Sequence, residues 1–145
     1  MANDELYTPK HIFDALNLRF DLDVCSPIEG PLHTPADKWY SQLDDGLEKP
    51  WFGRVWMNPP YSDASPWVDK WLNHKNGLAL TQISKSKWSK KLWDNVNVKL
   101  CFMTPKLKFI DVNGDEQPIY MPCVLWAIGE TNITALKESG LGVIR

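Results

Sequence analysis

The sequence predicts an α/β fold, with one domain spanning residues 1–145 and helices packed on a mixed β-sheet. Apolar stretches typical of strands alternate along the chain with stretches in which apolar residues recur at helical spacing. Near the end of the chain, Asn113-Gly114 is a strong hairpin-turn signal between residues 106–110 and 118–128, which predicts a C-terminal antiparallel hairpin. The length suits one sizeable core, and the sequence has no repeat, low-complexity tract or linker.

The first helix is predicted to begin at Thr8 and Pro9, with threonine as the N-cap and proline in the first helical position. Apolar residues recur at helical spacing over 12–16, and Asn17 is expected to end the helix. Residues 19–25 then alternate between apolar and polar side chains, which predicts a strand.

A long segment without a clear period follows, over residues 27–50. We expect a loop with one short strand around Trp39. A loop of this length is uncommon as a simple connection in a compact domain, so it is expected to be functional. Residues 53–57 predict the next strand, which ends at Asn58.

The rest of the chain continues the alternation. Ser65-Pro66 repeats the pattern of a cap followed by proline and predicts a second helix. Besides the hairpin, the expected elements are a strand at 78–83, a short basic helix at 84–95, a strand at 98–103, a helix at 132–139 and a strand at 142–144.

Composition excludes several classes of protein. Hydrophobic residues make up 43% of the chain and charged residues 23%, which is typical of a globular protein. No apolar run reaches the roughly 20 residues of a membrane span, and the polar start "MANDELYTPK" is unlike a secretory signal, so we expect a cytoplasmic protein. Three widely spaced cysteines and three histidines without paired spacing predict neither a disulfide nor a metal site.

The segment "VWMNPPYS", residues 55–62, changes abruptly from a buried strand to a rigid polar corner. Neither proline has an N–H for a sheet ladder, so the strand must end at Asn58. In open α/β sheets, ligands bind beyond the carboxyl ends of the strands. The alternative is a structural loop that the prolines stiffen and whose Tyr61 packs inward.

The tetrapeptide Asn58-Pro59-Pro60-Tyr61 looks like the catalytic motif of amino-methyltransferases that use S-adenosylmethionine. In this order, "YTPKHIFDAL", "FDLDVCSP", "DDGLEKPW" and "VWMNPPYS" resemble the phage-type Dam family of DNA N6-adenine methyltransferases. The resemblance covers most of the chain and implies a Rossmann-like methyltransferase fold, S-adenosylmethionine as cofactor and DNA as substrate.

The residue types of the motif suit methylation of an amine. The exocyclic amine of adenine is a poor nucleophile, because its lone pair is delocalised into the ring. Two acceptors, the Asn58 side-chain carbonyl and the Pro59 backbone carbonyl, can bind both amine hydrogens and direct the lone pair at the methyl group. Pro60 adds rigidity, and Tyr61 offers a flat face for a base turned out of the duplex.

The resemblance also implies a donor site at the end of the first strand. The expected donor contacts are Tyr7, Thr8, Pro9, Asp23, Val24, Cys25, Ser26, Asp45, Leu47 and Asn58. Asp23 would hold the methionine amino group, the alternative being an exposed acid on the solvent side of the strand. Asp44 could replace Asp45 beside the donor adenine, although we favour Asp45. Many methyltransferases have a glycine-rich motif where this chain has "DVCSPIEG". The resemblance implies a variant of this site, because a cysteine-containing version is normal in the family.

Basic residues predict where DNA binds. Lys85, Lys87 and Trp88, with Lys90 and Lys91 nearby, interleave positive charge with an aromatic ring. Lys106 and Lys108 add to this set. The alternative is a solvated helix face. The net charge of −2 gives no positive field, so a DNA partner requires such a local basic face.

The predicted function is methyl transfer to adenine N6 in DNA, without a metal and away from membranes. The same chemistry on cytosine N4, RNA adenine or a glutamine amide remains an alternative. A rival of another class is a non-catalytic nucleic-acid-binding module with the same fold. No separate target-recognition domain is visible in the sequence, so specificity is expected to be weak or to depend on a homodimer.

Overall fold

The structure is a computed structural model that describes residues 8–103, 115 and 122–145. The strands are β1 (Phe20–Ser26), β2 (Ala36–Ser41), β3 (Val55–Met57), β4 (Gly77–Gln82), β5 (Val98–Met103), β6 (Cys123–Ile128) and β7 (Gly142–Ile144). The helices are α1 (Lys10–Leu16), α2 (Ser65–His74), α3 (Lys87–Asp94) and α4 (Glu130–Glu138), and a short 3₁₀ turn, η2, spans Tyr61–Asp63.

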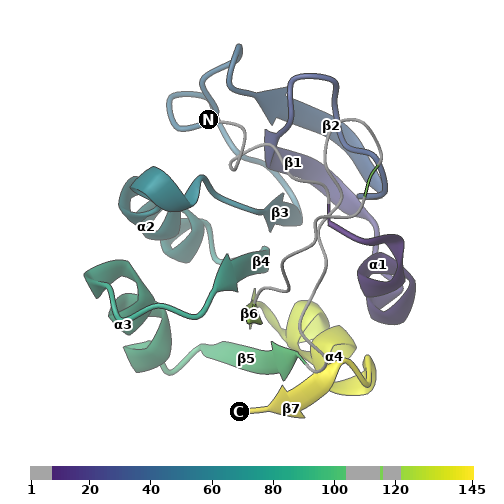
Figure 1. Cartoon of the computed structure of the whole chain (residues 1–145), viewed down its shortest axis with the longest axis vertical. Helices are drawn as coiled ribbons and strands as arrows, with labels where there is room; N and C mark the ends of the chain where they lie inside the picture. Colours follow the sequence, from purple (N-terminus) through teal and green to yellow (C-terminus); the bar gives the residue numbers. More distant parts are fainter. Residues whose placement is uncertain (1–7, 104–114, 116–121) are drawn as a thin grey trace.

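These strands form one mixed sheet in the order β2-β1-β3-β4-β6-β5-β7 (Figure 1). The pairs β1–β2, β1–β3 and β3–β4 are parallel. Strand β6 is antiparallel to both β4 and β5, so β4 and β5 run in the same direction, and β7 is antiparallel to β5. The predicted α/β class with a mixed sheet is confirmed, and the arrangement is compatible with a Rossmann-like methyltransferase fold.

Strand β6 pairs antiparallel with β5, where Cys101 faces Leu125. The turn predicted at Asn113-Gly114 and the strand predicted at 106–110 lie outside the described residues. Of the second hairpin strand, the part over 123–128 is confirmed as β6.

Helices cover both faces of the sheet, with α1 and α4 on one face and α2 and α3 on the other (Figure 1). The short strand β3 is buried on both faces, which explains its continuous apolar run. Trp56 packs edge-on against Phe13 of α1 and Phe20 of β1, with ring centroids 4.7 and 5.5 Å apart. Val55 and Met57 face the opposite core. The strand that leads to Asn58 is therefore held firmly from both sides.

The predicted helix starts are displaced by one to three residues, and the largest displacement is that of α3, which begins at Lys87 rather than at residue 84. Helix α1 begins at Lys10, so Pro9 is the N-cap, and the prediction of Thr8 in that role is wrong. The ψ angle of Pro9 is 146°, which is extended, so the fixed φ of proline does not place it inside the helix. Helix α2 likewise begins at Ser65, and α4 begins at Glu130 rather than at residue 132. The αL stop at Asn17 is confirmed.

A polar network joins the elements at the amino ends of the strands. Arg54 Nε donates to Asn132 Oδ1 at 2.6 Å, and Asn132 Nδ2 donates to Asn76 Oδ1 and to the Ile128 carbonyl, both at 2.8 Å. Asn132 is 1% exposed, so these bonds satisfy an otherwise costly buried amide. They tie α4 to the start of β3, at the end of the sheet opposite to Asn58. No helix in the described ranges is long and apolar enough to cross a membrane.

Candidate functional site

Two polar strand ends meet at the carboxyl edge of the parallel part of the sheet. Strands β1 and β3 pair with Asp23 opposite Trp56. Two residues further along are Cys25 in the first strand and Asn58 just after the second. The segments "DVCSP" and "NPPY" therefore emerge next to each other. The sheet therefore brings together the predicted donor site and the predicted catalytic corner, as expected for ligands of α/β sheets.

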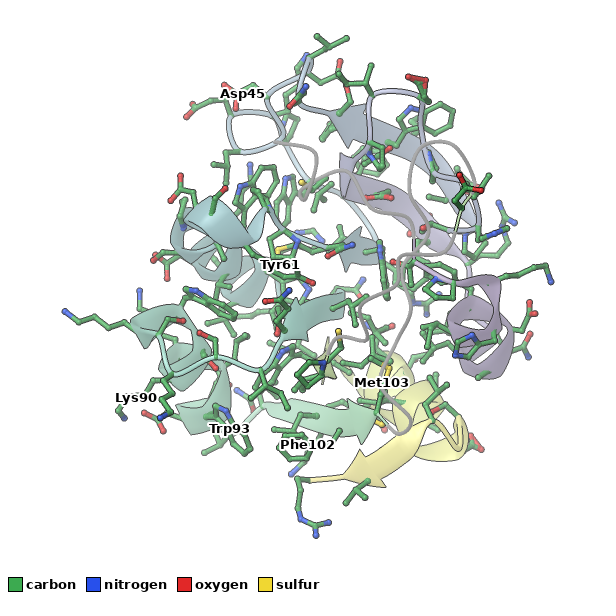
Figure 2. All side chains as sticks on the ribbon, in the orientation of Figure 1. Asp45, Tyr61, Lys90, Trp93, Phe102 and Met103 are labelled. Atoms are coloured by element: carbon green, nitrogen blue, oxygen red, sulfur yellow. The ribbon has the colours of Figure 1, made fainter. Side chains whose placement is uncertain are left out.

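The corner after β3 is built as the sequence predicts. Pro59 is buried and Asn58 half-buried. Pro60 is extended and leads into η2, whose Asp63 N–H donates to the Pro60 carbonyl at 3.1 Å. The Tyr61 hydroxyl donates to Asn58 Oδ1 at 3.2 Å, and Figure 2 shows Tyr61 between α2 and β4. The phenol thus orients the amide oxygen, a contact that the sequence did not predict.

Asp23 is a buried carboxylate at the end of β1. It is 3% exposed, so the alternative of an exposed acid on the solvent side of the strand is wrong. The sequence predicts that the polar residues of this strand, Asp21 and Asp23, face solvent. Asp21 is exposed as predicted, whereas Asp23 is buried. Burial raises the pKa of Asp23 to about 7, although a hydrogen bond from the Cys25 N–H to Oδ1, at 3.1 Å, opposes the shift. No salt bridge to Asp23 is found among the described residues.

The loop after β2 packs directly on the end of β1. Gly46 lies so close that a Cβ added there would be 2.4 Å from the Val24 carbonyl oxygen, which only glycine avoids. Asp45 precedes it with a φ of 54° and is exposed, as Figure 2 also shows. Asp44 instead caps the end of β2, because its Oδ2 accepts from the Ser41 N–H at 2.9 Å. Of the two acids, Asp45 is the one whose carboxylate is not bonded into this turn.

Lys70 of α2 holds this loop in place. Its Nζ donates to the carbonyls of Leu47 and Lys49 at 2.8 and 2.5 Å, and lies 5.0 Å from the centre of the Trp51 ring. Trp51 in turn donates through Nε1 to the Gly46 carbonyl at 2.8 Å. Sequence reasoning missed Lys70, Trp51 and Gly46. Only the Asp-Gly step at 45–46 carried a signal, since a lysine within a helix looks like an ordinary surface residue.

The first helix reaches the same edge. Because α1 ends at Leu16 and leads into the start of β1, its N-terminal end points toward the carboxyl ends of the strands. Thr8 is buried and Pro9 half-buried at this end. Tyr7, the third residue predicted here, lies outside the described residues.

The basic segment follows β4 and so also starts at this edge. Lys85 and Lys87 are exposed, and neither has an ion-pair partner in the described part of the chain. Lys90 pairs with Asp94, and Lys91 pairs with Asp69 at 2.7 Å.

The other members of the predicted DNA-binding set differ from Lys85 and Lys87. Trp88 is half-buried against the core between α3 and the sheet, so much of its ring is not free for stacking. Lys106 and Lys108 lie outside the described residues.

The arrangement fits a positively charged sulfonium donor with an amino group. The buried Asp23 offers a carboxylate with no cation beside it among the described residues. Gly46 brings the backbone of its loop against the end of β1, so both segments border the same place. Within the described ranges, no group of three or more His, Cys, Asp or Glu side chains could hold a metal ion.

Comparison with known proteins identifies relatives. The family model described as DNA N-6-adenine-methyltransferase (Dam) matches residues 1–119, a range that includes every predicted site residue. A DNA N-6-adenine-methyltransferase of Haemophilus phage HP1 (strain HP1c1) is 28% identical over 108 residues, which are 70% of this chain and 61% of the relative. The chain thus spans about three fifths (61%) of the length of that relative. No solved structure matches.

The ionisation of Asp23 predicts a pH-dependent stability. Because the folded protein holds the Asp23 proton more tightly than the unfolded chain does, stability falls as the pH rises from about 4 to about 7. Asp23→Asn removes this penalty and keeps an acceptor for Cys25. The gain in unfolding free energy should be roughly 3 kcal/mol larger at pH 8 than at pH 5, measured by urea denaturation. Asp63→Asn, an exposed control, should show no such difference, and an equal gain at both pH values for Asp23→Asn would refute the assignment.

Proposed function

Because the chain belongs to the DNA N-6-adenine-methyltransferase (Dam) family, we propose that it transfers a methyl group from S-adenosylmethionine to the N6 amine of adenine in DNA. The observation that carries this proposal is that the Asn58 amide lies next to the end of β1, where the Asp23 carboxylate is buried. We also propose that residues 1–145 act as one methyltransferase domain, because a single sheet joins the elements on which both sites depend.

The donor is proposed to bind across the end of β1. Its ammonium group would pair with Asp23, whose buried position strengthens the attraction of opposite charges. A carboxylate with a raised pKa must lose its proton to form this pair, so donor binding at neutral pH releases a proton from Asp23. The backbone of Val24, Cys25 and Ser26 would line the rest of this part of the pocket.

The adenine end of the donor is proposed to lie against the loop that Lys70 holds. Asp45 and Leu47 flank Gly46, which itself touches the end of β1. Asp45 is preferred over Asp44, since the Asp44 carboxylate accepts hydrogen bonds from Ser41. When bound, the donor supplies an electrophilic methyl group on sulfur, and the protein has to position it facing Asn58.

Asn58 and Pro59 are proposed to accept the two hydrogens of the target amine. A carbonyl oxygen has two lone pairs, and the Tyr61 hydroxyl uses one of those on Asn58 Oδ1. The other remains for the amine. Drawing both hydrogens toward fixed acceptors makes the nitrogen tetrahedral and frees its lone pair for attack, without a strong base. The adenine, turned out of the duplex, would stack on the Tyr61 ring.

The chemical test is methylation of DNA by the pure protein with isotope-labelled S-adenosylmethionine, followed by digestion to nucleosides and mass spectrometry. We expect labelled N6-methyl-2′-deoxyadenosine from DNA. Label on cytosine, on RNA alone or on protein glutamine would indicate the alternative substrates. A chain that binds no donor in calorimetry would be the non-catalytic module.

Asn58→Ala should lower the single-turnover rate by at least about a hundredfold, because the main acceptor for the amine is gone. Donor affinity, measured by calorimetry, should remain largely intact, because Asn58 is only one of the expected donor contacts and Asp23 and the loop at 44–50 are unchanged. Asn73→Ala, an exposed change on α2, serves as control. Methylation by Asn58→Ala at the unchanged rate would show that the side chain plays no part in the chemistry.

Two substitutions of Tyr61 separate its ring from its hydroxyl. Tyr61→Ala should reduce the single-turnover rate strongly, because stacking on an aromatic ring stabilises an extruded base by about 1–3 kcal/mol. Tyr61→Phe keeps the ring and loses the hydroxyl that donates to Asn58, so a reduction of about three- to tenfold is expected. Donor binding should survive both changes, and equal rates for the two variants would contradict the stacking role.

Lys85 and Lys87 are proposed to contact DNA phosphates beside the catalytic corner. Replacing both by Gln should weaken DNA binding and reduce the slope of log K against log salt by up to about 2, one unit for each lost phosphate contact. Fluorescence anisotropy at several salt concentrations measures this slope. Lys90→Gln with Lys91→Gln is the matched control, because these lysines pair with acids of the chain itself. A larger effect from the control pair would refute the assignment.

A further inference from the structure

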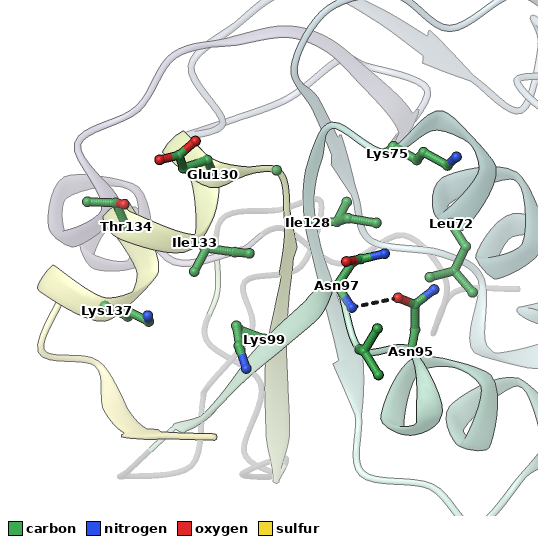
Figure 3. A pocket seen from close by; sticks show the side chains of 12 residues that line it. Leu72, Lys75, Asn95, Asn97, Lys99, Ile128, Glu130, Ile133, Thr134 and Lys137 are labelled. Carbon is green, nitrogen blue, oxygen red and sulfur yellow. Dashed lines mark hydrogen bonds between the residues drawn. The ribbon is translucent and has the colours of Figure 1, made fainter.

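An open cavity lies at the amino ends of β3 and β4, on the opposite side of the sheet's strand ends from Asn58. It has a volume of about 690 Å³ and is lined by residues from the end of α2, the turn between α3 and β5, the start of β5, the end of β6 and α4 (Figure 3). Strand β6 ends here at Ile128 and β5 begins here at Val98. Because these are the edges remote from the carboxyl end of β3, this cavity is separate from the proposed methyltransferase site.

Three lysines give the cavity a positive charge. Lys75, Lys99 and Lys137 line it, and Glu130 is the one carboxylate among its lining residues. Among the described residues, none of the three lysines lies within salt-bridge distance of an acid, whereas Lys90 and Lys91 of α3 are both paired. The cavity thus gathers two net positive charges on a chain whose overall charge is −2.

The positive charges enter from different elements. Figure 3 shows Lys137 on α4 and Lys99 on β5, with Lys75 at the end of α2. Lys99 is half-buried, so its stem is held by its neighbours while its amine reaches the cavity. Lys75 lies across the cavity from Lys137 and its amine points away from the other two lysines (Figure 3). A ligand bound between α4 and β5 could contact the amines of Lys99 and Lys137 together.

The remaining lining residues suit a planar, polar ring. Leu72, Ile128 and Ile133 supply apolar surface. Asn95 Oδ1 accepts a hydrogen bond from the Asn97 N–H at 2.9 Å, and this bond does not use the NH₂ group of Asn95. The side-chain amide of Asn97 adds a further donor and acceptor to the cavity. The volume falls in the range of about 300–1,000 Å³ typical of small-molecule sites and far exceeds the space that phosphate alone requires.

We propose that this cavity binds a nucleoside monophosphate, with the phosphate near Lys99 and Lys137 and the base against the apolar floor and the two asparagines. The proposal does not rest on the proposed methyl transfer, because it uses other residues at another edge. It assigns to the protein a small-molecule site in addition to the one for the methyl donor.

The experiment uses the full chain with adenosine monophosphate as the probe. Saturation with S-adenosylmethionine first keeps the probe out of the donor site. In ¹⁵N-labelled protein we expect saturable shifts of the amide signals of Asn97, Lys99, Gly129 and Thr134, with those of Cys25 and Tyr61 unchanged. The double change Lys99→Gln with Lys137→Gln should weaken the binding of adenosine monophosphate by about tenfold or more. Lys38→Gln, an exposed lysine on β2, should leave it unchanged.

Three results would overturn the proposal: no saturable shifts at this edge, shifts confined to the carboxyl edge, or equal affinity of the double variant and the parent chain. Inorganic phosphate is the comparison ligand. Affinity for phosphate equal to that for adenosine monophosphate would show that the base is not recognised and would refute a nucleotide site. The shifts in the parent chain provide the answer even if the double variant proves unstable.

Discussion

The parallel pairing of β1 with β3 is the constraint on which the site depends. With Asp23 opposite Trp56, the last residues of both strands emerge side by side, and a slip by one residue would turn every side chain of β3 to the other face. The pairing is secured by burial on both sides of the sheet. Trp56 packs between Phe13 and Phe20, while Val55 and Met57 pack under α2. The corner at residues 58–61, the proposed catalytic corner, is held in place because the strand before it is packed on both faces.

The site combines two kinds of polar group that the fold treats differently. Asn58 is neutral, half-buried and already oriented by Tyr61, so it can stay hydrogen-bonded before and during binding. Asp23 is a carboxylate under low-dielectric cover, which makes its charged form unfavourable until a cation arrives. An ammonium group on the donor would relieve that cost. The same burial that lowers stability at neutral pH therefore prepares the proposed donor site, a compromise common at functional sites.

Both edges of the sheet carry polar residues, but they are organised for different ends. At the amino edge, Arg54, Asn132 and Asn76 bond to one another and hold α4 against the sheet. Next to this closed network, Lys75, Lys99 and Lys137 remain without acidic partners in the described part of the chain. At the carboxyl edge, Lys70 is bonded to loop carbonyls, whereas Lys85 and Lys87 remain exposed. Charged side chains that bond within the protein, such as Lys70, support the fold. Lysines without such partners in the described ranges mark the places where we expect ligands to bind.

The sequence by itself determined the class of the fold, the order of its elements and the rigid corner at residues 58–61. Local rules are sufficient for these features: period and length identify strands and helices, and two prolines after an apolar run end a strand wherever it lies. Helix starts were displaced by one to three residues. In α1 and α2 the reason is that a proline fits either at the cap or just inside the helix.

Only the tertiary structure decided that Asp23 is buried, that Asp45 rather than Asp44 has an uncommitted carboxylate, and that Lys70 and Gly46 hold the loop on β1. These facts depend on which segments meet across the sheet. An alternating strand reads the same whether one face or both are covered. A helical lysine reads the same whether it meets water or three carbonyl oxygens, because its partners are distant in the chain.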